Sequence, residues 1–468
     1  MNPLVLPQAE YETVFQRLTQ LSLEYLASIP DRPSFPEVTG CDLESWFSPH
    51  LPQQGLGTAA FDDLAKVIAG CRPNSPRFFG YVFGSGEPVA AAAGLLTAVL
   101  NQNTTAWRSA PSAVTLERIV VGWLAEAVGC GGFTGSLTGG GSPANLMALA
   151  MAREARLPAN QQGARPGTVY ASEQAHMSIA KAVALLGIGR DYLRLIACDD
   201  QFRTRPEVLR AAIARDIAAG LVPIAIVGSA GTVATGSIDP LDELAAIAGE
   251  CGAWFHVDGA YGALASIAVP ERFVGLNQAD SLSLDPHKWL YQPVDCGCLL
   301  YRDAAAARRA LSHTGEYVRS LLEDTVEGFA FFEESMELSR PFRALKLWLS
   351  LRYHGLEKFR DSIHNDLQNA QRLAELISRR PELELLAPIP LSAVCFRHVS
   401  RQDSDALNRK ILQRVVRRGR VFLSNASIEG RFALRACFVN HRTTADDVGQ
   451  IVDEVLLAGR EVAAGAEP

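Results

Sequence analysis

The sequence predicts an α/β fold with a mostly parallel sheet, followed by a smaller α+β domain. Between residues 168 and 301 short apolar runs alternate with helical stretches, which is typical of buried parallel strands covered by helices on both faces. Near the C-terminus the pattern changes to strand, helix, strand, strand, helix. A chain of 468 residues is long enough to hold both domains.

The N-terminal part is expected to form a helical and extended arm. Residues 9–29 place apolar side chains at helical spacing, and Pro30 ends that helix. Residues 30–58 are rich in Pro and Gly, so we expect an extended segment there. Further helices are expected over 59–70 and 113–128.

The predicted elements of the two domains follow from the same patterns. In the large domain the strands are 168–170, 193–197, 223–228, 253–257, 281–284 and 297–301, and the helices are 175–188, 206–219 and 240–251. Towards the C-terminus we expect helices 341–354 and 356–380, strand 393–398, helix 404–418, strands 421–424 and 432–438, and helix 444–459. The resulting division is an arm over 1–85, a large domain over 86–350 and a small domain over 351–468.

Composition and charge exclude several classes of protein. Apolar residues make up 48% of the chain and charged residues 20%, as in folded rather than disordered proteins. The net charge of −7 argues against nucleic-acid binding, which usually requires a basic surface. No apolar run reaches about 18 residues, so we expect no membrane-spanning helix. The start of the chain lacks signal-peptide features and the nine cysteines form no CxxC pair, so a cytoplasmic location is expected.

A glycine-rich segment from Thr138 to Asn145 runs into an apolar helical stretch. Glycines let backbone N–H groups approach an anion closely, while Ser142 and Pro143 suit the N-cap and the first helical position. A helix that begins in this way can bind phosphate. The segment lacks the GK[ST] of a P-loop, and by itself it also fits a simple loop and cap.

Three further segments place reactive side chains after predicted strands. His176 and Asp258 lie where ligands of parallel sheets collect, and a buried Asp needs a partner such as a protonated ring nitrogen. Lys288, one of six lysines, follows Pro286 and precedes Trp289, which favours a poorly solvated amine that attacks aldehydes. Taken alone, each also fits a structural role: a capping histidine, an aspartate that orders its loop, and a surface lysine.

Together the four segments supply what pyridoxal phosphate requires. The glycine-rich helix start would hold the phosphate, and His176 would stack on the ring. Asp258 would meet the pyridine N–H⁺, and Lys288, 30 residues further on, would condense with the aldehyde. No metal site is expected.

These residues lie in motifs by which the chain resembles the group II pyridoxal-phosphate-dependent amino-acid decarboxylases. That family includes aromatic-amino-acid, histidine, glutamate and diaminobutyrate decarboxylases. The resemblance covers nearly the whole chain, and its combination of motifs is very specific. The motifs are PRFFGY at 76–81, TGGGSPAN at 138–145, SEQAH at 172–176, HVDGAYG at 256–262, DPHKW at 285–289 and SRPFRALKLW at 339–348.

The resemblance implies a role for each matched residue. Lys288 would form the internal aldimine, Asp258 would keep the pyridine nitrogen protonated, and His176 and Ala260 would pack on opposite faces of the ring. The residues implied for the phosphate are Gly141, Ser142 and His287, with Asp285 nearby where some relatives have Asn. Thr232 lies at or next to a cofactor-contacting Thr of the family.

For the substrate, the resemblance points to residues before and after the cofactor motifs. The candidates are Tyr81, Phe83, Gly84, Asn103, Thr105 and the small-domain Arg435. Asn103 and Thr105 offer polar groups where aromatic decarboxylases have apolar ones, which weakens the prediction of an aromatic substrate.

The reaction implied is decarboxylation of an L-amino acid to the amine and CO₂, through an aldimine on Lys288 and a quinonoid. An alternative is oxidative conversion to an aldehyde, but Tyr317 and His176 are the residues that favour simple decarboxylation in the family. Transamination and aldol cleavage are further reactions that this fold supports. A cofactor-free binding protein is disfavoured because Lys288 and Asp258 are present, and a nicotinamide enzyme because no GxGxxG follows a strand.

The fold implied by the resemblance is that of aspartate aminotransferase, known as fold type I. It is implied as an intertwined homodimer with active sites at the subunit interface. The N-terminal helix would then pack on the partner subunit.

Overall fold

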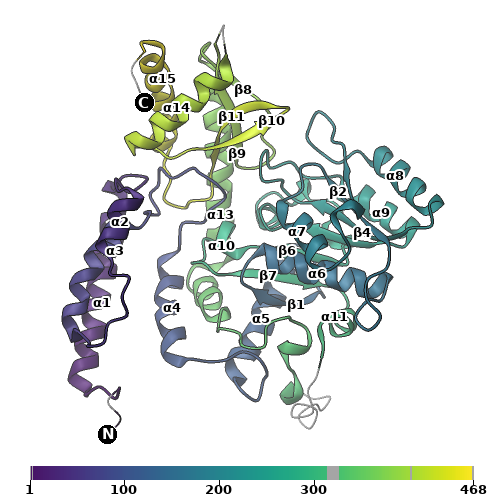
Figure 1. The fold of residues 1–468 in the computed structure, drawn as a ribbon, viewed down its shortest axis with the longest axis horizontal. Coiled ribbons are helices and arrows are strands. Elements are labelled where there is room, and N and C mark those ends of the chain that lie inside the picture. The colour runs from purple at the N-terminus through teal and green to yellow at the C-terminus, as the bar shows by residue number, and fades with distance from the viewer. Residues whose placement is uncertain (1, 3, 314–325, 401–402, 466–468) are drawn as a thin grey trace.

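The computed structural model describes residues 2, 4–313, 326–400 and 403–465, and it has three connected parts (Figure 1). A helical arm stands at the N-terminal end. A seven-stranded sheet with its helices forms the largest part, and a four-stranded sheet with its helices forms the C-terminal part.

The large sheet has the strand order β1-β7-β6-β5-β4-β2-β3. The strands from β6 to β3 in this order run parallel, whereas β7 is antiparallel to both β1 and β6, so the predicted mostly parallel sheet is confirmed. The strand over Thr134–Thr138 was not predicted, because it carries only one large apolar side chain, Leu137. The bounds are β1 Thr134–Thr138, β2 Gly167–Ser172, β3 Leu193–Ile196, β4 Val222–Ser229, β5 Trp254–Asp258, β6 Ser281–Leu284 and β7 Gly297–Tyr301.

Alternate side chains of the central strands enter two separate cores. Tyr170 and Ile226 pack under α5, α8 and α9, while Ala171 and Val227 pack under α6, α7 and α11. Because both faces are covered, the side chains of these strands are buried, and ligands can reach the sheet only at the strand ends. The helices are α5 Pro111–Ala127, α6 Gly141–Arg156, α7 Met177–Leu185, α8 Pro206–Ala218, α9 Leu241–Cys251 and α11 Ala304–Leu311.

The small domain contains an antiparallel sheet of order β10-β11-β9-β8, packed against α13, α14 and α15. The predicted strand over 421–424 is wrong, since β10 begins only at Ser424. Phe422 instead exchanges backbone hydrogen bonds with residues 77–79, so this apolar run joins the small domain to the segment before α4. The bounds are β8 Leu383–Leu385, β9 Ala393–His398, β10 Ser424–Ile428, β11 Arg431–Cys437, α13 Ala344–Ser378, α14 Ser404–Arg418 and α15 Ala445–Ala463.

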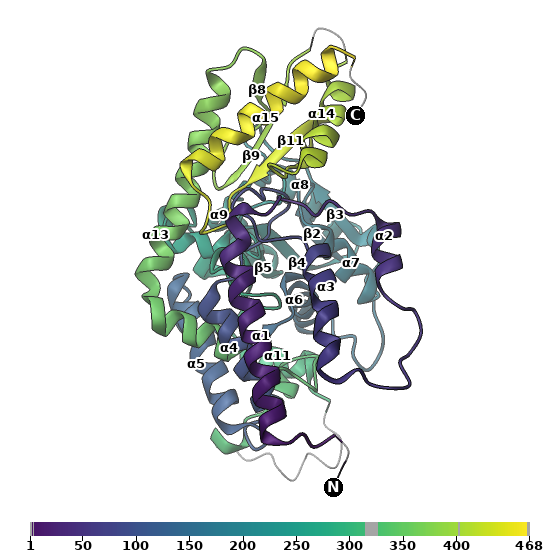
Figure 2. The same cartoon turned by 90° about the vertical axis from the view of Figure 1, so that its left-hand side faces the viewer.

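The N-terminal arm lies outside both cores. It contains α1 (Gln8–Ser28), α2 (Gly40–Trp46) and α3 (Leu64–Gly70), none of which has a buried residue. Figure 2 shows α1 and α3 on one side of the molecule. The stretch predicted to be extended contains α2, whose capping box pairs Thr39 with Asp42. No helix in the described ranges is long and apolar enough to cross a membrane.

A fully buried ion pair holds the segment after α4 (Pro88–Leu100) against β1. The Arg340 guanidinium pairs with Glu117 of α5 and donates to the carbonyl oxygens of Leu137 at 2.8 Å and Thr104 at 3.1 Å. The backbone N–H of Arg340 donates to Asn103 Oδ1 at 2.9 Å. Glu117 is the fully buried carboxylate partner of this charge, because Glu337, the other nearby carboxylate, lies 3.9 Å from Arg340 Nε and is 30% exposed.

Glu117→Ala is therefore expected to lower the free energy of unfolding by about 3–5 kcal/mol, because the charge of Arg340 stays buried without its fully buried carboxylate partner. Chemical denaturation measures this change. Asp63→Ala removes an exposed ion pair with Lys66 and serves as the control that should leave stability nearly unchanged. Equal stability of the Glu117 variant and the control would contradict the assignment.

Candidate active site

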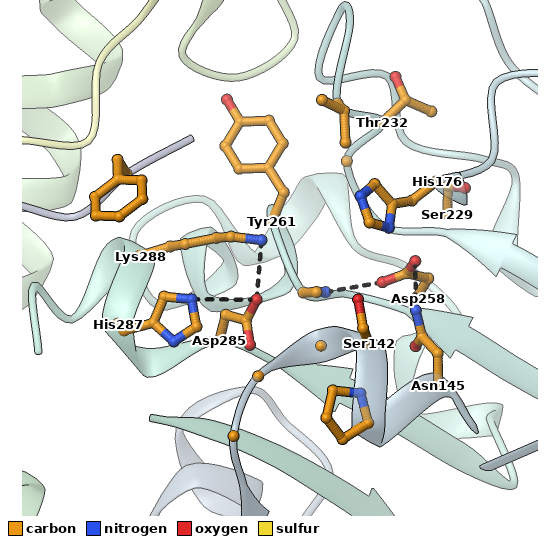
Figure 3. Close-up of a pocket in the computed structure, with 18 of the residues that line it drawn as sticks. Ser142, Asn145, His176, Ser229, Thr232, Asp258, Tyr261, Asp285, His287 and Lys288 are labelled. Carbon is orange, nitrogen blue, oxygen red and sulfur yellow. Dashed lines mark hydrogen bonds and ion pairs between the residues drawn. The ribbon is translucent and has the colours of Figure 1, made fainter. Parts of the chain in front are cut away.

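A cavity of about 290 Å³ opens at the carboxyl ends of the strands, where ligands of parallel sheets bind (Figure 3). The side chains around it come from the turns that follow β1, β2, β4, β5 and β6. Ten residues predicted for the site line this cavity: Phe83, Gly141, Ser142, His176, Thr232, Asp258, Ala260, Asp285, His287 and Lys288.

The glycine-rich turn leads from β1 directly into α6. Gly140 is the N-cap, with a φ of 141° that residues with a side chain rarely adopt, so the prediction of Ser142 as N-cap is wrong. Ser142 lies in the first turn and its hydroxyl lines the cavity. The backbone N–H groups of Gly141 and Ser142 have no acceptor within the helix, which leaves them available to an anion.

Asp258 ends β5 and is only 8% exposed. Its Oδ2 accepts a hydrogen bond from Asn145 Nδ2 at 2.9 Å. Its Oδ1 accepts from Ser283 Oγ at 3.1 Å and from the Ala260 N–H at 3.2 Å. Donors from α6, from β6 and from the turn after β5 therefore fix the orientation of this carboxylate.

Asn145 connects Asp258 to two histidines. Its Oδ1 lies 3.0 Å from His256 Nε2, and its Nδ2 also donates to Ser178 Oγ at 2.9 Å. Burial lowers the pKa of His256 to about 4, so this ring is neutral at pH 7 and its proton is on Nε2, facing the amide oxygen.

His176 is held in one tautomer by the same network. It is the N-cap of α7, and its Nδ1 accepts from the Ser178 N–H at 3.3 Å. Ser178 Oγ lies 2.8 Å from the same Nδ1 and already accepts from Asn145, so it donates its own proton to the ring. The ring proton of His176 is therefore on Nε2. Burial lowers the pKa of His176, which keeps the ring neutral at pH 7.

Lys288 follows β6 in the short helix α10 (Pro286–Trp289). Its Nζ lies 2.9 Å from Asp285 Oδ2, and His287 Nε2 lies 3.6 Å from the same oxygen, as the dashed lines in Figure 3 show. His287 Nδ1 lies 2.8 Å from the carbonyl oxygen of Cys296 and 3.4 Å from the Cys296 backbone nitrogen, and the shorter contact favours Nδ1 as a donor to the carbonyl. The Lys288 side chain is 18% exposed, so its amine is partly desolvated at the cavity wall.

Four residues of this network had no role predicted from the sequence. They are Asn145, Ser178, His256 and Ser283, and Asn145 and His256 lie inside two of the quoted motifs. The sequence signal that could have identified them is a polar residue in an otherwise apolar strand or helix, close to a predicted site residue, because a buried polar group needs a hydrogen-bond partner.

The cavity has the donor set that pyridoxal phosphate requires. The start of α6 offers backbone N–H groups to a phosphate, Asp258 is an acceptor for a ring N–H⁺, and Lys288 offers an amine. The space depends on glycine, since a Cβ at Gly141 would lie 2.6 Å from Ala260 Cβ and 3.2 Å from Asp285 Oδ2. The residues present therefore fit this group.

Three residues predicted to bind substrate lie beside the cavity but do not line it. The Tyr81 side chain is 59% exposed, and a Cβ at Gly84 would lie 2.0 Å from the His287 carbonyl oxygen, so Gly84 supports α10. Arg435 is buried and donates to the carbonyl oxygens of Tyr81, Val233 and Ala234. Arg435 thus ties the small domain to the loop after β4.

Asn103 and Thr105 lie in the segment after α4, and neither lines the cavity of the same chain. Asn103 Oδ1 accepts a hydrogen bond from the backbone N–H of Arg340, and Thr105 Oγ1 is buried without a hydrogen-bond partner. Tyr317 lies outside the described residues.

The tautomers give a prediction for NMR with ¹⁵N-labelled histidine. His256 should stay neutral down to about pH 4, with a protonated Nε2 and an acceptor Nδ1, because burial disfavours its charged form. Asn145→Leu removes the acceptor that faces His256 Nε2 and should alter the shifts of His256 and His176 together. Titration of His256 near pH 6.5 would contradict the assignment.

Comparisons with known proteins agree with this geometry. The model of the pyridoxal-dependent decarboxylase conserved domain matches residues 46–399. An aromatic-L-amino-acid decarboxylase from Bacillus atrophaeus is 30% identical, over 98% of this chain and 97% of the relative. A phenylacetaldehyde synthase from Petunia hybrida is 34% identical, over 77% of this chain and 76% of the relative.

A solved structure is also similar over its whole length. The crystal structure of Oryza sativa TDC with PLP and tryptamine superposes with a TM-score of 0.91 at 26% identity, over 99% of each chain. The fold is therefore that of the pyridoxal-phosphate decarboxylases, as predicted. This chain belongs to the pyridoxal-dependent decarboxylase family and is a pyridoxal-phosphate-dependent amino-acid decarboxylase.

Proposed function

We propose that Lys288 binds pyridoxal phosphate covalently and that the enzyme converts an L-amino acid to its amine and CO₂ at this cavity. One observation carries the proposal. Lys288, the Asp258 carboxylate and the start of α6 line a single cavity although they come from three distant segments. When bound, pyridoxal phosphate supplies the electron-accepting ring that allows CO₂ to leave the substrate.

Side chains of the protein orient the cofactor ring and stabilise its positive charge. Asp258, fixed by Asn145 and Ser283, accepts the ring N–H⁺ and keeps that proton in place. His176, with its neutral ring, covers one face of the cofactor, and Ala260 packs against the other.

The phosphate group has its own set of residues in this proposal. The N–H groups of Gly141 and Ser142, the Ser142 hydroxyl and His287 hold it at the start of α6. Asp285 lies beside the same place, and Thr232 closes the cavity from the loop after β4.

We propose an aromatic side chain on the substrate. The outer wall of the cavity carries Phe83, Val233 and Val294, whose apolar surface favours a large apolar group. The names of the relatives from Bacillus atrophaeus and Petunia hybrida support the same class, although the polar Asn103 and Thr105 were an argument against it.

We propose a homodimer in which the arm and α4 pack on the second copy. Four apolar side chains of α4 are between 44% and 58% exposed: Leu95, Leu96, Val99 and Leu100. Tyr11, Phe15 and Leu23 of α1 are also exposed, and so much apolar surface indicates an interaction site. The segment with Asn103 and Thr105 follows α4 directly, so it would reach the cavity of the second copy.

The three-part division remains a proposal with a role for each part. The arm over 1–85 makes dimer contacts, residues 86–350 bind the cofactor, and residues 351–468 form the small domain that Arg435 ties to the loop after β4. We also propose a cytoplasmic location, supported by nine cysteines that are all free in the structure.

A panel of L-amino acids, assayed together for CO₂, amine, ammonia and peroxide, tests the reaction. We expect CO₂ and amine from an aromatic amino acid without peroxide. Lys288→Ala should abolish both the visible absorbance of the cofactor and the borohydride-trapped adduct, because no other group then binds the aldehyde. Lys410→Ala, at an exposed position, is the matched control.

Two outcomes would reject this proposal. An unchanged adduct in Lys288→Ala would remove Lys288 from its role. Peroxide and ammonia released together with CO₂ would instead favour the aldehyde synthase activity named for the Petunia hybrida relative.

Analytical ultracentrifugation tests the dimer. The wild-type protein should sediment at twice the chain mass of 50.5 kDa. The double variant Leu96→Arg, Val99→Arg should shift towards the monomer, because it places two charges in the apolar contact. Ile217→Arg changes an exposed apolar residue of α8 and is the control. A wild-type protein that is monomeric at micromolar concentration would overturn the proposal.

A further inference from the structure

Asp285 is the least compensated charge in the cavity. It lies between β6 and α10 and is 3% exposed. Its Oδ1 is buried and has no hydrogen-bond partner, and its Oδ2 pairs with Lys288 Nζ at 2.9 Å. An Asp at the start of a helix often caps it, but Asp285 makes no such bond, so its carboxylate is directed elsewhere.

The Asp285 carboxylate is directed towards the start of α6. A Cβ at Gly141 would lie 3.2 Å from Asp285 Oδ2, and a Cβ at Gly140 would lie 3.9 Å from Oδ1. The same glycines form the place where the proposed function puts the cofactor phosphate. A carboxylate and a phosphate, both negative near neutral pH, would therefore border each other in a partly buried cavity.

Lys288 is the cation that balances Asp285 in the described chain. The other titratable groups that face Asp285 are His176, His287, Cys296 and Cys298. Burial lowers the pKa of both histidines and raises the pKa of both thiols, so all four are uncharged near pH 8.

Arg343 also approaches the glycine-rich turn, but its charge is already paired with two carboxylates. Its guanidinium lies 3.7 Å from a Cβ placed on Gly139. It pairs with Asp295 at 2.9 Å and with Glu337 at 2.8 Å. Arg343 therefore does not supply a free positive charge to Asp285.

Attachment of the cofactor removes the ion pair of Asp285 and Lys288. Nζ would first release one proton to solvent, and the neutral amine and the aldehyde would then form a C=N bond with loss of one water. Lys288 would no longer offer Asp285 Oδ2 a free ammonium group, and the phosphate would add negative charge beside the same carboxylate. Asp285 then needs another source of positive charge.

His287 is placed to share a proton with Asp285. Its Nδ1 lies 2.8 Å from the Cys296 carbonyl oxygen and 3.4 Å from the Cys296 backbone nitrogen. The shorter contact places the proton of the neutral ring on Nδ1, so Nε2 carries no hydrogen. Nε2 and Asp285 Oδ2 are thus two acceptors that face each other at 3.6 Å. One proton between them satisfies both and cancels the charge beside the phosphate.

We propose that the Asp285–His287 pair takes up one proton when the phosphate of the cofactor binds, so that cofactor affinity depends on pH. This inference rests on the proposed function. Linkage gives its sign: if binding takes up one proton, the dissociation constant rises about tenfold for each pH unit above the range in which the free pair is already protonated.

Calorimetric titration of the apo-enzyme at pH 8, in two buffers of different ionisation enthalpy, counts the protons taken up. Pyridoxal 5′-phosphate and pyridoxal carry the same aldehyde, so the difference between them isolates the phosphate. We expect a difference of one proton in the wild type and none in Asp285→Asn. Asp303→Asn, at the exposed N-cap of α11, is the control and should match the wild type.

The pH dependence gives a second measurement that needs no variant. The dissociation constant of pyridoxal 5′-phosphate should rise about tenfold per unit between pH 7.5 and 9 relative to that of pyridoxal. Equal proton counts for the two aldehydes in the wild type, or the same count in Asp285→Asn, would overturn the inference. If neither aldehyde forms an adduct with Lys288, the proposed function fails instead.

Discussion

The hydrogen bonds of the Asp258 carboxylate hold together the parts of this site. The carboxylate stands at the end of a buried strand, so it must find its donors within the protein. They come from Asn145 in α6, Ser283 in β6 and the backbone of Ala260. The bond to Asn145 orients α6, whose first turn carries the proposed phosphate cradle. The bond to Ser283 orients β6, which leads directly to Asp285 and Lys288.

The two buried carboxylates of the cavity have different surroundings. Asp258 accepts three hydrogen bonds, all from neutral donors. Asp285 relies on the amine of Lys288, which the proposed chemistry uses. Two titratable groups whose environments differ in this way are suited to different tasks, one as a fixed acceptor and one as a group that gains and loses a proton. The histidines around them are kept neutral by burial.

The residues expected to bind the cofactor and those expected to bind the substrate lie apart in the chain's own structure. All residues proposed for the cofactor line one cavity, whereas Asn103 and Thr105 do not line it, and Asn103 accepts a hydrogen bond from the backbone N–H of Arg340. Exposed apolar side chains lie on α1, in the N-terminal arm, and on α4, the helix that leads directly to Asn103. A second copy packed there would account for both observations.

Much of the fold could be predicted from the sequence, because buried parallel strands and their helices leave strong local patterns. The strands over 281–284 and 297–301 and the helix over 404–418 have the predicted bounds. The strand over Thr134–Thr138 has too little apolar surface to be recognised, and Phe422 lies in an apolar run that pairs with a distant segment rather than with its own sheet. Such pairings depend on which segments meet in space, which a local pattern does not contain.

Residue order was enough to predict the reactive groups of the site: a glycine-rich helix start, and His176, Asp258 and Lys288, each at or after the end of a predicted strand of one mostly parallel sheet. The carboxyl ends of parallel strands share one edge, so these side chains had to meet. Their states were set by the packed chain. It placed Gly140 rather than Ser142 at the N-cap, put the proton of His176 on Nε2 through Ser178 and Asn145, and left Asp285 Oδ1 without a partner. Hydrogen bonds between distant segments set these states, because each depends on the distance and direction of a neighbour rather than on residue type.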